Sequence, residues 1–469
     1  MIMAPETPMR ITPELLRRYD QPGPRYTSYP TAVEWKPDIT GEMTAAALGE
    51  ASSRETDPLS LYVHLPYCAS RCLYCGCNAT VPASASDVTA YLDALVRELD
   101  DVAALLCPRR VLSQLHWGGG TPNYLTPEQA ERLREAIAER FTFTPDAEIA
   151  IEINPSLATP EQLRLLRNLG FNRISLGVQD LAPEVQRAVA RNQTWQQTRL
   201  VFETCRELGF QGINIDLIYG LPLQRAEAWQ QTLDRVCELR PDRIAVYSFA
   251  WLPDRLPHQQ ALARFPMPEA EEKLALFAAA RNRFITEGYR PIGMDHFALP
   301  EDELSRAMDT GRLNRNFMGY TVQTATEQVG IGASAISEFP ALYAQNVKDP
   351  GTYIALAGKG LPPTASGVVL DADDRLRRRL IRDLMCRFRL RWSDLAAFHP
   401  SLANPVNAPE VFADAWPDLQ AMERDGLVEL QGDGLTVTPL GRVFVRVVCM
   451  AFDIRLRRSR NQAAFSRTV

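Results

Sequence analysis

Short apolar stretches alternate with amphipathic ones from residue 61 to about residue 300. Helical periodicity is clear in residues 88–106, where apolar side chains recur every three or four positions. The sequence Thr-Pro-Glu, at 126–128 and again at 159–161, predicts the capped first turns of two further helices. Alternating strands and helices predict a parallel sheet that forms a full or partial barrel. The predicted strands are residues 61–66, 113–120, 147–155, 172–180, 213–222 and 242–250.

Polar side chains share one face of four of these strands. In residues 172–180, for example, Ser175, Gly177 and Gln179 alternate with apolar residues, and strand side chains alternate between faces. An open sheet with one solvated face gives this pattern. In a barrel wrapped by helices the polar face points inward, where a structural core would carry branched apolar residues, so we favour a cofactor-binding cavity. The other polar positions on this face are Tyr62, His64, Glu152, Asn154, Asn214 and Asp216.

The chain of 469 residues has room for a barrel-sized domain and a smaller one. A linker is predicted at residues 358–367, after which come a helix and then a second helix followed by two short strands. That order is typical of a winged-helix module. We predict an α/β fold: a partial TIM-like parallel (β/α) barrel at 56–360, an N-terminal extension at 1–55, and a small, mainly helical, winged-helix-like C-terminal domain at 361–469.

Composition excludes several classes of protein. Hydrophobic residues make up 46% of the chain and charged residues 23%, and the net charge of −6 gives no indication of a nucleic-acid or anionic-membrane surface. The N-terminus lacks the apolar core of a secretory signal, and no apolar run has the length of a membrane span. We expect a cytoplasmic monomer with no nucleic-acid or membrane partner.

Nine cysteines in a cytosolic chain do not predict a disulfide framework. Five of them are scattered along the chain, and we expect them to be small buried core residues. These five are Cys107, Cys205, Cys237, Cys386 and Cys449. The other four lie within ten residues, and this clustering indicates a site.

The clustered thiols are Cys68, Cys72, Cys75 and Cys77. Thiolate tetrads bind structural zinc, but zinc sites usually take two short cysteine pairs from separate loops, so a single loop is geometrically awkward. A fully ligated electron-transfer cluster also needs four thiolates, and the spacing fits neither ferredoxin pattern. The third kind of site is a four-iron cluster held by three cysteines, which leaves one iron open for a substrate or cofactor.

The pattern Cx3Cx2C directly after the first predicted strand resembles that of the radical S-adenosylmethionine enzymes. In that family three cysteines hold a 4Fe-4S cluster, and the open iron binds the amino and carboxylate groups of S-adenosylmethionine. Adding an electron to a sulfonium is difficult, so it requires a low-potential cluster in direct contact. The sulfonium then cleaves to a 5′-deoxyadenosyl radical, which a closed barrel shields from water.

Further motifs resemble those of the oxygen-independent coproporphyrinogen III oxidase family over nearly the whole chain. They are PRYTSYPT, CGCN, HWGGGTP, SLGVQD, NIDLIYGLP and GMDHFALP. The resemblance implies a coproporphyrinogen III dehydrogenase that converts two propionates of coproporphyrinogen III to vinyls, giving protoporphyrinogen IX in haem biosynthesis. It also implies two S-adenosylmethionine molecules per protein, an electron donor such as a flavodoxin or ferredoxin, and an N-terminal extension that covers the substrate.

The resemblance assigns roles to residues of this chain. Cys68, Cys72 and Cys75 would be the iron ligands, and Cys77 a non-ligand for which redox participation and simple packing both stay open. Tyr62, Gly119, Glu152 and Ile336 would contact the first S-adenosylmethionine, and Tyr74 is a further cofactor-binding candidate. Gly120, Thr121, Gln179, Arg191, Asp216 and the backbone of Ala250 would contact the second. Several of these lie on the polar face described above, which supports the cavity.

The four carboxylates of the substrate require a local basic lining. Arg25 is a candidate for binding a propionate through two guanidinium nitrogens, and an exposed loop arginine is the alternative. Tyr26 and Tyr29 either flank a tetrapyrrole or pack the N-terminal segment. The catalytic candidates are Cys77, Tyr62 and Arg25. Three histidines are weaker candidates, since a satisfied interior histidine is the commoner case; they are His64, His116 and His296.

Two other functions compete with the oxidase. A related haem chaperone shares the barrel, the cluster and GGGTP, but its pattern usually has phenylalanine in place of Cys77 and lacks PRYTSYPT. A zinc-stabilised DNA-binding regulator built on the C-terminal module would need a basic helix that the sequence does not show. The presence of Cys77 and of PRYTSYPT favours the oxidase over the chaperone, and the missing basic helix argues against the regulator.

Overall fold

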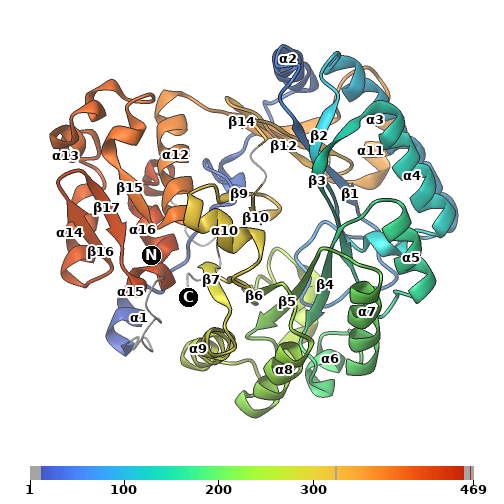
Figure 1. The fold of residues 1–469 in the computed structure, drawn as a ribbon, viewed down its shortest axis with the longest axis horizontal. Helices are drawn as coiled ribbons and strands as arrows, with labels where there is room; N and C mark the ends of the chain where they lie inside the picture. Colours follow the sequence, from blue (N-terminus) through green and yellow to red (C-terminus); the bar gives the residue numbers. More distant parts are fainter. Residues whose placement is uncertain (1–11, 323–324, 459–464, 466–469) are drawn as a thin grey trace. The chain divides into compact units, whose positions relative to one another are not determined.

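The computed structural model describes residues 12–322, 325–458 and 465. The chain forms two compact units. Unit 1 comprises the described residues of 1–35, 281–322 and 370–469, and unit 2 those of 36–280 and 323–369 (Figure 1). Residues 36–55, predicted as part of an N-terminal extension, therefore cluster with the barrel strands. The division into domains at 1–55, 56–360 and 361–469 stays a prediction.

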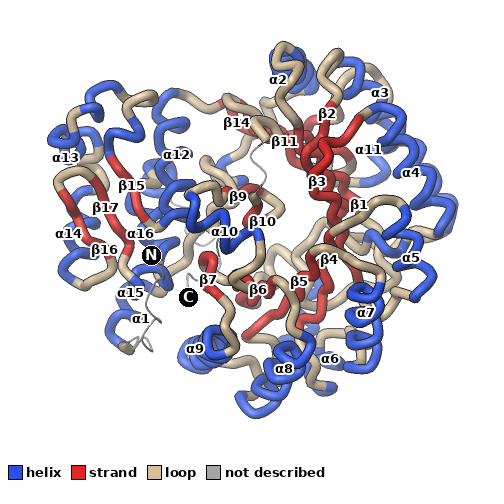
Figure 2. The backbone as a smooth tube through the Cα atoms, viewed as in Figure 1, coloured by secondary structure: helices blue, strands red, loops and turns tan. Residues whose placement is uncertain are grey.

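Unit 2 is built on a mainly parallel sheet, shown as red strands in Figure 2. Parallel neighbours in chain order are β1 (Leu59–Leu65), β2 (Val111–Gly119), β3 (Thr142–Ile153), β4 (Arg173–Gln179), β5 (Gly212–Tyr219) and β6 (Arg243–Ser248). On the other side of β1 lie β11 (Gln328–Ile331), parallel to β1, and the antiparallel strands β12 (Ile336–Glu338), β13 (Leu342–Asn346) and β14 (Thr364–Val369). This sheet confirms the predicted α/β fold. The linker prediction is wrong in part, because residues 364–367 pair with β13.

Helices connect the parallel strands, and α3, α4, α5, α7 and α8 lie along one side of the sheet (Figure 1). As predicted, α4 and α5 begin at Pro127 and Pro160, where Thr126 and Thr159 accept first-turn N–H groups. The helices of unit 2 include α2 (Gly41–Ser52), α3 (Ala85–Leu105), α4 (Pro127–Arg140), α5 (Pro160–Asn168), α6 (Pro183–Ala188), α7 (Trp195–Glu207), α8 (Ala226–Leu239) and α11 (Pro350–Leu356). α9 (Ala270–Thr286) spans the division between the units.

The two faces of the sheet differ in burial as predicted. In β4, Ile174, Leu176 and Val178 are buried, whereas the residues between them are only partly buried. On the apolar face, the Trp117 ring of β2 meets the Phe171 ring edge-on, at 4.9 Å between centroids. The partly buried face carries the polar residues, among them Tyr62, Glu152, Gln179 and Asp216. The alternation of the sequence thus specifies which face is polar.

Unit 1 contains the C-terminal module. α12 (Ala372–Arg387) and α14 (Trp416–Arg424) share an apolar cluster with an antiparallel sheet of β15 (Arg389–Arg391), β17 (Gly434–Val437) and β16 (Val428–Gln431). The helix followed by two strands was predicted, whereas β15 is too short to show a pattern. Unit 1 also contains α1 (Pro13–Tyr19), β7 (Arg290–Gly293), β8 (His296–Ala298), α10 (Glu303–Thr310), β9 (Asn314–Asn316), β10 (Gly319–Thr321), α15 (Pro439–Val443), α16 (Val445–Ala451) and α17 (Ile454–Arg458).

The scattered cysteines follow the prediction only in part. Cys205, Cys386 and Cys449 are buried, as expected. The prediction is wrong for Cys107, which is exposed in the turn after α3, and Cys237 on α8 is only partly buried. Helical spacing indicates which face of a helix a residue lies on, but it does not show at which residue the helix ends or how far the residue is exposed to solvent.

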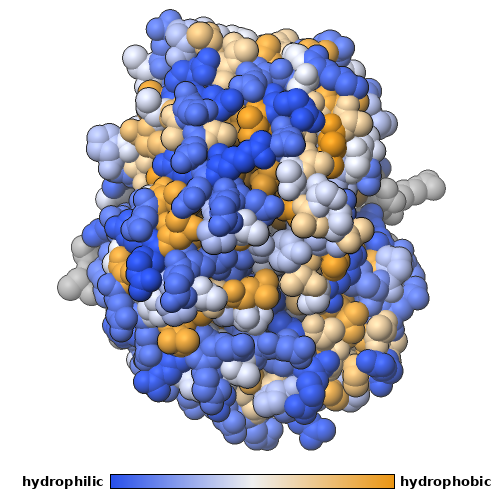
Figure 3. Space-filling model, turned by 90° about the vertical axis from the view of Figure 1, so that its right-hand side faces the viewer, coloured by the Kyte–Doolittle hydropathy of each residue, from blue (hydrophilic) through white to orange (hydrophobic). Residues whose placement is uncertain are grey.

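The face that carries α3 to α7 is mainly hydrophilic, with hydrophobic residues in small separate patches (Figure 3). Among the described helices, none combines the length and the apolar composition that crossing a membrane requires. Scattered apolar residues on such a surface are ordinary and indicate no binding site.

Candidate cofactor site

The four clustered cysteines lie in the loop between β1 and α3. Backbone hydrogen bonds fix this loop, because Cys68 N–H donates to Thr80 O at 2.9 Å and Leu73 N–H donates to Val189 O at 2.9 Å. Leu73 and Tyr74 pack against an apolar cluster that includes residues of α6 and β5. Backbone hydrogen bonds and the packing of Leu73 and Tyr74 therefore anchor the loop within unit 2.

The thiols of this loop differ in proton affinity. A hydrogen bond from the Cys77 thiol lowers the pKa of Cys75 to about 6, against the effect of burial, and the same bond raises the pKa of Cys77. Burial raises the pKa of Cys68, an effect that the Thr121 hydroxyl, 3.1 Å from its sulfur, opposes. The Cys75–Cys77 hydrogen bond thus favours the thiolate form of Cys75, the form that binds metal, and the thiol form of Cys77.

These residues fit an iron–sulfur cluster. Thiolates are the ligands that iron–sulfur clusters take, and the loop supplies four thiols, of which Cys75 has a lowered pKa. Gly120 keeps the space beside Cys68 open, since a Cβ at Gly120 would lie 3.1 Å from Cys68 Sγ and 2.5 Å from Pro66 O. Across the part of the chain that the structure describes, no three His, Cys, Asp or Glu side chains meet as a single metal ion requires.

Strands β1, β2 and β3 bring four predicted residues together. Tyr62 and His116 are register partners, and their rings stack at 5.8 Å between centroids and 22° between planes. His116 Nε2 lies 3.1 Å from Glu152 Oε1, and Glu152 Oε2 accepts the Gly119 N–H at 3.2 Å. Burial, with the charge of Glu152, raises the pKa of Tyr62, so its hydroxyl stays protonated.

His64 links this group to the cysteine loop. Burial lowers the pKa of His64, so its imidazole is neutral. Its Nε2–H donates to the Asn78 carbonyl oxygen at 2.9 Å, which leaves Nδ1 to accept from the Tyr62 hydroxyl at 3.1 Å. Gly119, at φ +116°, lets the chain pass close to the ring, because a Cβ there would lie 2.7 Å from His64 Cε1. Both ring nitrogens of His64 therefore have partners.

A second polar group lies on β4 and β5. Asp216 accepts hydrogen bonds from Ser175 Oγ at 2.7 Å and from Asn214 Nδ2 at 2.9 Å. Gln179 ends β4 at φ +69°, a left-handed conformation that costs energy in a residue with a Cβ and that is common at functional sites. A Cβ at Gly177 would lie 2.9 Å from Gln179 Nε2, so glycine leaves room for this side chain.

Arg191, after α6, joins this second group to the cysteine loop. Its Nη1 lies 3.6 Å from Cys72 Sγ and donates to the Tyr74 hydroxyl at 3.2 Å. Its Nη2 donates to Gly177 O and, at 3.3 Å, to Asn154 Oδ1. Burial would lower the pKa of Arg191, but Tyr74 and Cys72 outweigh it and hold that pKa above its usual value. The buried guanidinium is a fixed positive charge in the site.

Ile336 begins β12, next to the glycine-rich turn after β11. Gly330 is the register partner of Tyr62, and a Cβ at Gly330 would lie 2.5 Å from Ile336 O, so the two strands approach closely.

Glu98 on α3, which was not predicted from the sequence, accepts the Gly332 N–H at 2.8 Å. Glu98 follows Tyr91 by seven positions and so lies on the apolar face of the helix. An acidic residue on such a face is the sequence feature that indicates a buried polar contact.

The N-terminal candidates lie in unit 1. Arg25 forms an ion pair with the buried Asp295, whose Oδ1 lies 2.6 Å from His296 Nδ1. Burial acts to raise the pKa of Asp295, but Arg25 and His296 outweigh it and hold that pKa well below its usual range. Tyr26 and Tyr29 are buried in the apolar cluster of unit 1. Arg25 is therefore not an isolated loop cation, and both tyrosines pack the N-terminal segment.

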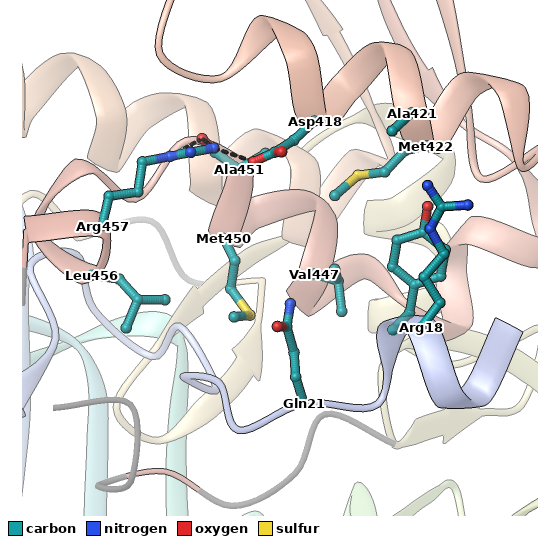
Figure 4. A pocket seen from close by; sticks show the side chains of 11 residues that line it. Arg18, Gln21, Asp418, Ala421, Met422, Val447, Met450, Ala451, Leu456 and Arg457 are labelled. Atoms are coloured by element: carbon teal, nitrogen blue, oxygen red, sulfur yellow. Dashed lines mark hydrogen bonds and ion pairs between the residues drawn. The ribbon is translucent and has the colours of Figure 1, made fainter. Parts of the chain in front are cut away.

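Unit 1 also has a pocket of about 340 Å³ between α1 and the C-terminal module (Figure 4). Met422, Val447 and Met450 form an apolar part of its wall, and Arg457 pairs with Asp418 at its side. The residues that the sequence assigns to the cofactors do not line it. Its charged side chains already have partners, because Arg457 pairs with Asp418 and Arg18 pairs with Asp425.

Comparison with known proteins identifies the family. Residues 62–236 match the Radical SAM superfamily, and residues 370–444 match the HemN C-terminal domain. Oxygen-independent coproporphyrinogen III oxidase from Pseudomonas aeruginosa is 42% identical over 458 residues, which cover 97% of this chain and 98% of that protein. The chain belongs to the oxygen-independent coproporphyrinogen III oxidase family.

Other members of the oxygen-independent coproporphyrinogen III oxidase family are similarly close to this chain in sequence or structure. The relative from Escherichia coli is 41% identical over 455 residues, or 97% of this chain and 98% of that protein. The solved structure of coproporphyrinogen III oxidase (HemN) from Escherichia coli, described as a radical SAM enzyme, matches with a TM-score of 0.86 over 92% of this chain and 97% of that one. The match to the Radical SAM superfamily supports a 4Fe-4S cluster and S-adenosylmethionine as cofactors. Membership disfavours the haem-chaperone alternative.

Proposed function

We infer that the chain is an S-adenosylmethionine-dependent oxidoreductase of haem biosynthesis that acts on coproporphyrinogen III without oxygen. Each of two propionates loses a hydrogen atom, an electron and carbon dioxide and becomes a vinyl group, which gives protoporphyrinogen IX. Identity of 42% along 97% of the chain to a coproporphyrinogen III oxidase carries this conclusion. The thiol loop beside a polar sheet face supports it chemically.

Cys68, Cys72 and Cys75 are the proposed iron ligands, and Cys77 stays a protonated neighbour. When bound, the cluster and S-adenosylmethionine supply the electron and the carbon radical that removes hydrogen from the substrate. The chain's own groups orient the cofactor. Glu152 offers a carboxylate to an ammonium group, and its position is held by His116 and by the Gly119 N–H.

A second S-adenosylmethionine is proposed beside β4 and β5, which makes two per protein. Asp216 and Gln179 offer acceptors to hydroxyl or ammonium groups, and the fixed charge of Arg191 suits a carboxylate. Gly120, Thr121 and the Ala250 backbone complete the proposed contacts, and Tyr62, Tyr74 and Ile336 those of the first molecule.

The remaining partners are proposals of the same kind. A flavodoxin or ferredoxin supplies electrons, and the protein acts as a cytoplasmic monomer. Arg25 is the candidate anchor for a substrate propionate, which would share the guanidinium with Asp295. Tyr62 and Cys77 are the other proposed participants in the reaction.

An anaerobic assay tests the function. Reconstituted protein is mixed with coproporphyrinogen III, S-adenosylmethionine and a strong reductant, and the oxidised products are separated and detected by porphyrin fluorescence. We expect protoporphyrin together with 5′-deoxyadenosine, and neither from Cys72→Ala. Formation of 5′-deoxyadenosine while the porphyrin keeps its four carboxylates would contradict the substrate assignment, and haem transfer would then be measured.

A further inference from the structure

The buried amide of Gln259 joins the cysteine loop to the segment after β6. Gln259 lies in the 3-10 helix η3 (Pro257–Arg264) and is 1% exposed. Its Nε2 donates to Tyr74 O in the cysteine loop at 3.1 Å and to Ala250 O after β6 at 3.1 Å. Its Oε1 accepts the Leu252 N–H at 2.7 Å. The two amide hydrogens and the amide oxygen thus bind backbone groups of the cysteine loop and of the segment after β6, which are far apart from each other in the sequence.

The same short helix holds the cysteine loop by two further contacts. His258 Nε2 lies 2.8 Å from the Cys75 carbonyl oxygen, which can only accept, so the histidine donates. Leu262 belongs to the apolar cluster against which Leu73 and Tyr74 pack. These contacts reach backbone oxygens and apolar side chains, not sulfur atoms. Ligation of the thiols therefore does not compete with these contacts for the same atoms.

Only an amide satisfies all three backbone groups at this position. Glutamate has the same shape, but an ionised carboxylate would set negative charge against the Tyr74 and Ala250 carbonyl oxygens. Methionine has a similar length and would leave the two carbonyls and the Leu252 N–H without partners in a buried place. The requirement is thus for the hydrogen-bonding pattern of Gln259, not for its volume.

We propose that Gln259 is a positioning residue that couples the iron–sulfur loop to the second S-adenosylmethionine site. It does so by holding the Tyr74 and Ala250 carbonyls at one amide nitrogen. The inference rests on the proposed second S-adenosylmethionine, of which the Ala250 backbone is a contact. Loss of the amide weakens binding of the second S-adenosylmethionine. More 5′-deoxyadenosine then forms for each product molecule, while iron stays bound.

The test compares Gln259→Glu and Gln259→Met with Gln260→Glu, a matched control at the exposed neighbouring residue. Iron content, calorimetric titration with S-adenosylmethionine, and 5′-deoxyadenosine per protoporphyrinogen are measured anaerobically on the reconstituted full-length protein. Both Gln259 variants should keep the iron content of the wild type. One of the two S-adenosylmethionine molecules should bind about tenfold or more weakly, since buried hydrogen bonds are lost. More 5′-deoxyadenosine should form per product.

The outcomes separate the inference from the function on which it rests. Two S-adenosylmethionine molecules bound with wild-type affinity in both Gln259 variants, with an unchanged product ratio, would overturn the inference. So would loss of iron in both variants, because Gln259 would then only support the cluster loop. Wild-type protein that makes no protoporphyrinogen, or that binds a single S-adenosylmethionine, would instead contradict the proposed function. The methionine variant introduces no charge, so agreement between the two variants excludes an effect of charge alone.

Discussion

Arg109 and Glu327 form an ion pair in which neither side chain is exposed to solvent, with Nη1 2.6 Å from Oε2. Arg109 also donates to the backbone oxygens of Ala51 at 3.1 Å, Asp57 at 2.7 Å and Pro58 at 3.2 Å. Glu327 directly precedes β11, and Arg109 lies shortly before β2. The pair therefore fastens the beginnings of three neighbouring strands, because β1 begins at residue 59.

Substitution of Arg109 by methionine should lower the free energy of unfolding by about 3 kcal/mol. The loss leaves a buried carboxylate with the partly exposed Arg54 as its remaining cation. Urea unfolding measures the effect. Arg132→Met is the control, because its pair with Asp93 is exposed and should contribute at most about 1 kcal/mol. Equal losses in the two variants would contradict the expected difference between buried and exposed pairs.

Glu98 should make stability fall as pH rises. Burial raises its pKa from 4.5 to about 7, although Gly332 N–H, Asn346 Nδ2 and the Tyr353 hydroxyl donate to it. The folded protein therefore binds this proton more tightly than the unfolded chain. Stability is lost between the two pKa values as pH increases, by at most about 3 kcal/mol.

Glu98→Gln cannot titrate, so its thermal unfolding midpoint should change less between pH 5 and pH 8 than that of the wild type. The exposed Glu131→Gln is the control and should behave as the wild type does. Identical pH dependence in wild type and Glu98→Gln would show that Glu98 is ionised in the folded protein throughout this range.

Neighbouring thiols of the cysteine loop should respond differently to replacement. Cys75→Ser removes a proposed iron ligand, so reconstituted protein should lose most of its iron and its brown absorbance. Cys77→Ser removes a protonated thiol and should keep the iron of the wild type. Cys107→Ser, at an exposed cysteine, is the control. Loss of iron from Cys77→Ser would make Cys77 a ligand.

The Glu152 carboxylate should be needed for S-adenosylmethionine and not for iron. Glu152→Gln keeps an oxygen for the Gly119 N–H but removes the negative charge. The KM for S-adenosylmethionine should rise about tenfold or more at unchanged iron content, as expected when a charged hydrogen bond is lost. Asp146→Asn, exposed on the same strand, is the control. An unchanged KM would exclude Glu152 from the cofactor contacts.

The sequence alone predicted the parts of this protein that depend on local pattern. Alternation along β4 places Ser175 and Gln179 on the polar face, because strand side chains point to opposite sides in turn. Threonine before proline predicted the beginnings of α4 and α5, because capping acts within one turn. The clustered cysteines are local as well, because the three proposed ligands belong to one short loop and lie within eight positions of the sequence.

Tertiary structure decided the contacts between residues remote in sequence. Arg191 reaches Cys72 across 119 positions, and Gln259 reaches Tyr74 across 185. Arg25, for which the sequence left a propionate anchor and an exposed loop arginine open, meets Asp295 across 270 positions in a partly buried ion pair. No periodicity records such pairs, because each depends on how strands and loops pack, and packing brings any two parts of a chain together. The local pattern determined which chemistry the chain carries, and the packing of the barrel decided which residues hold it in place.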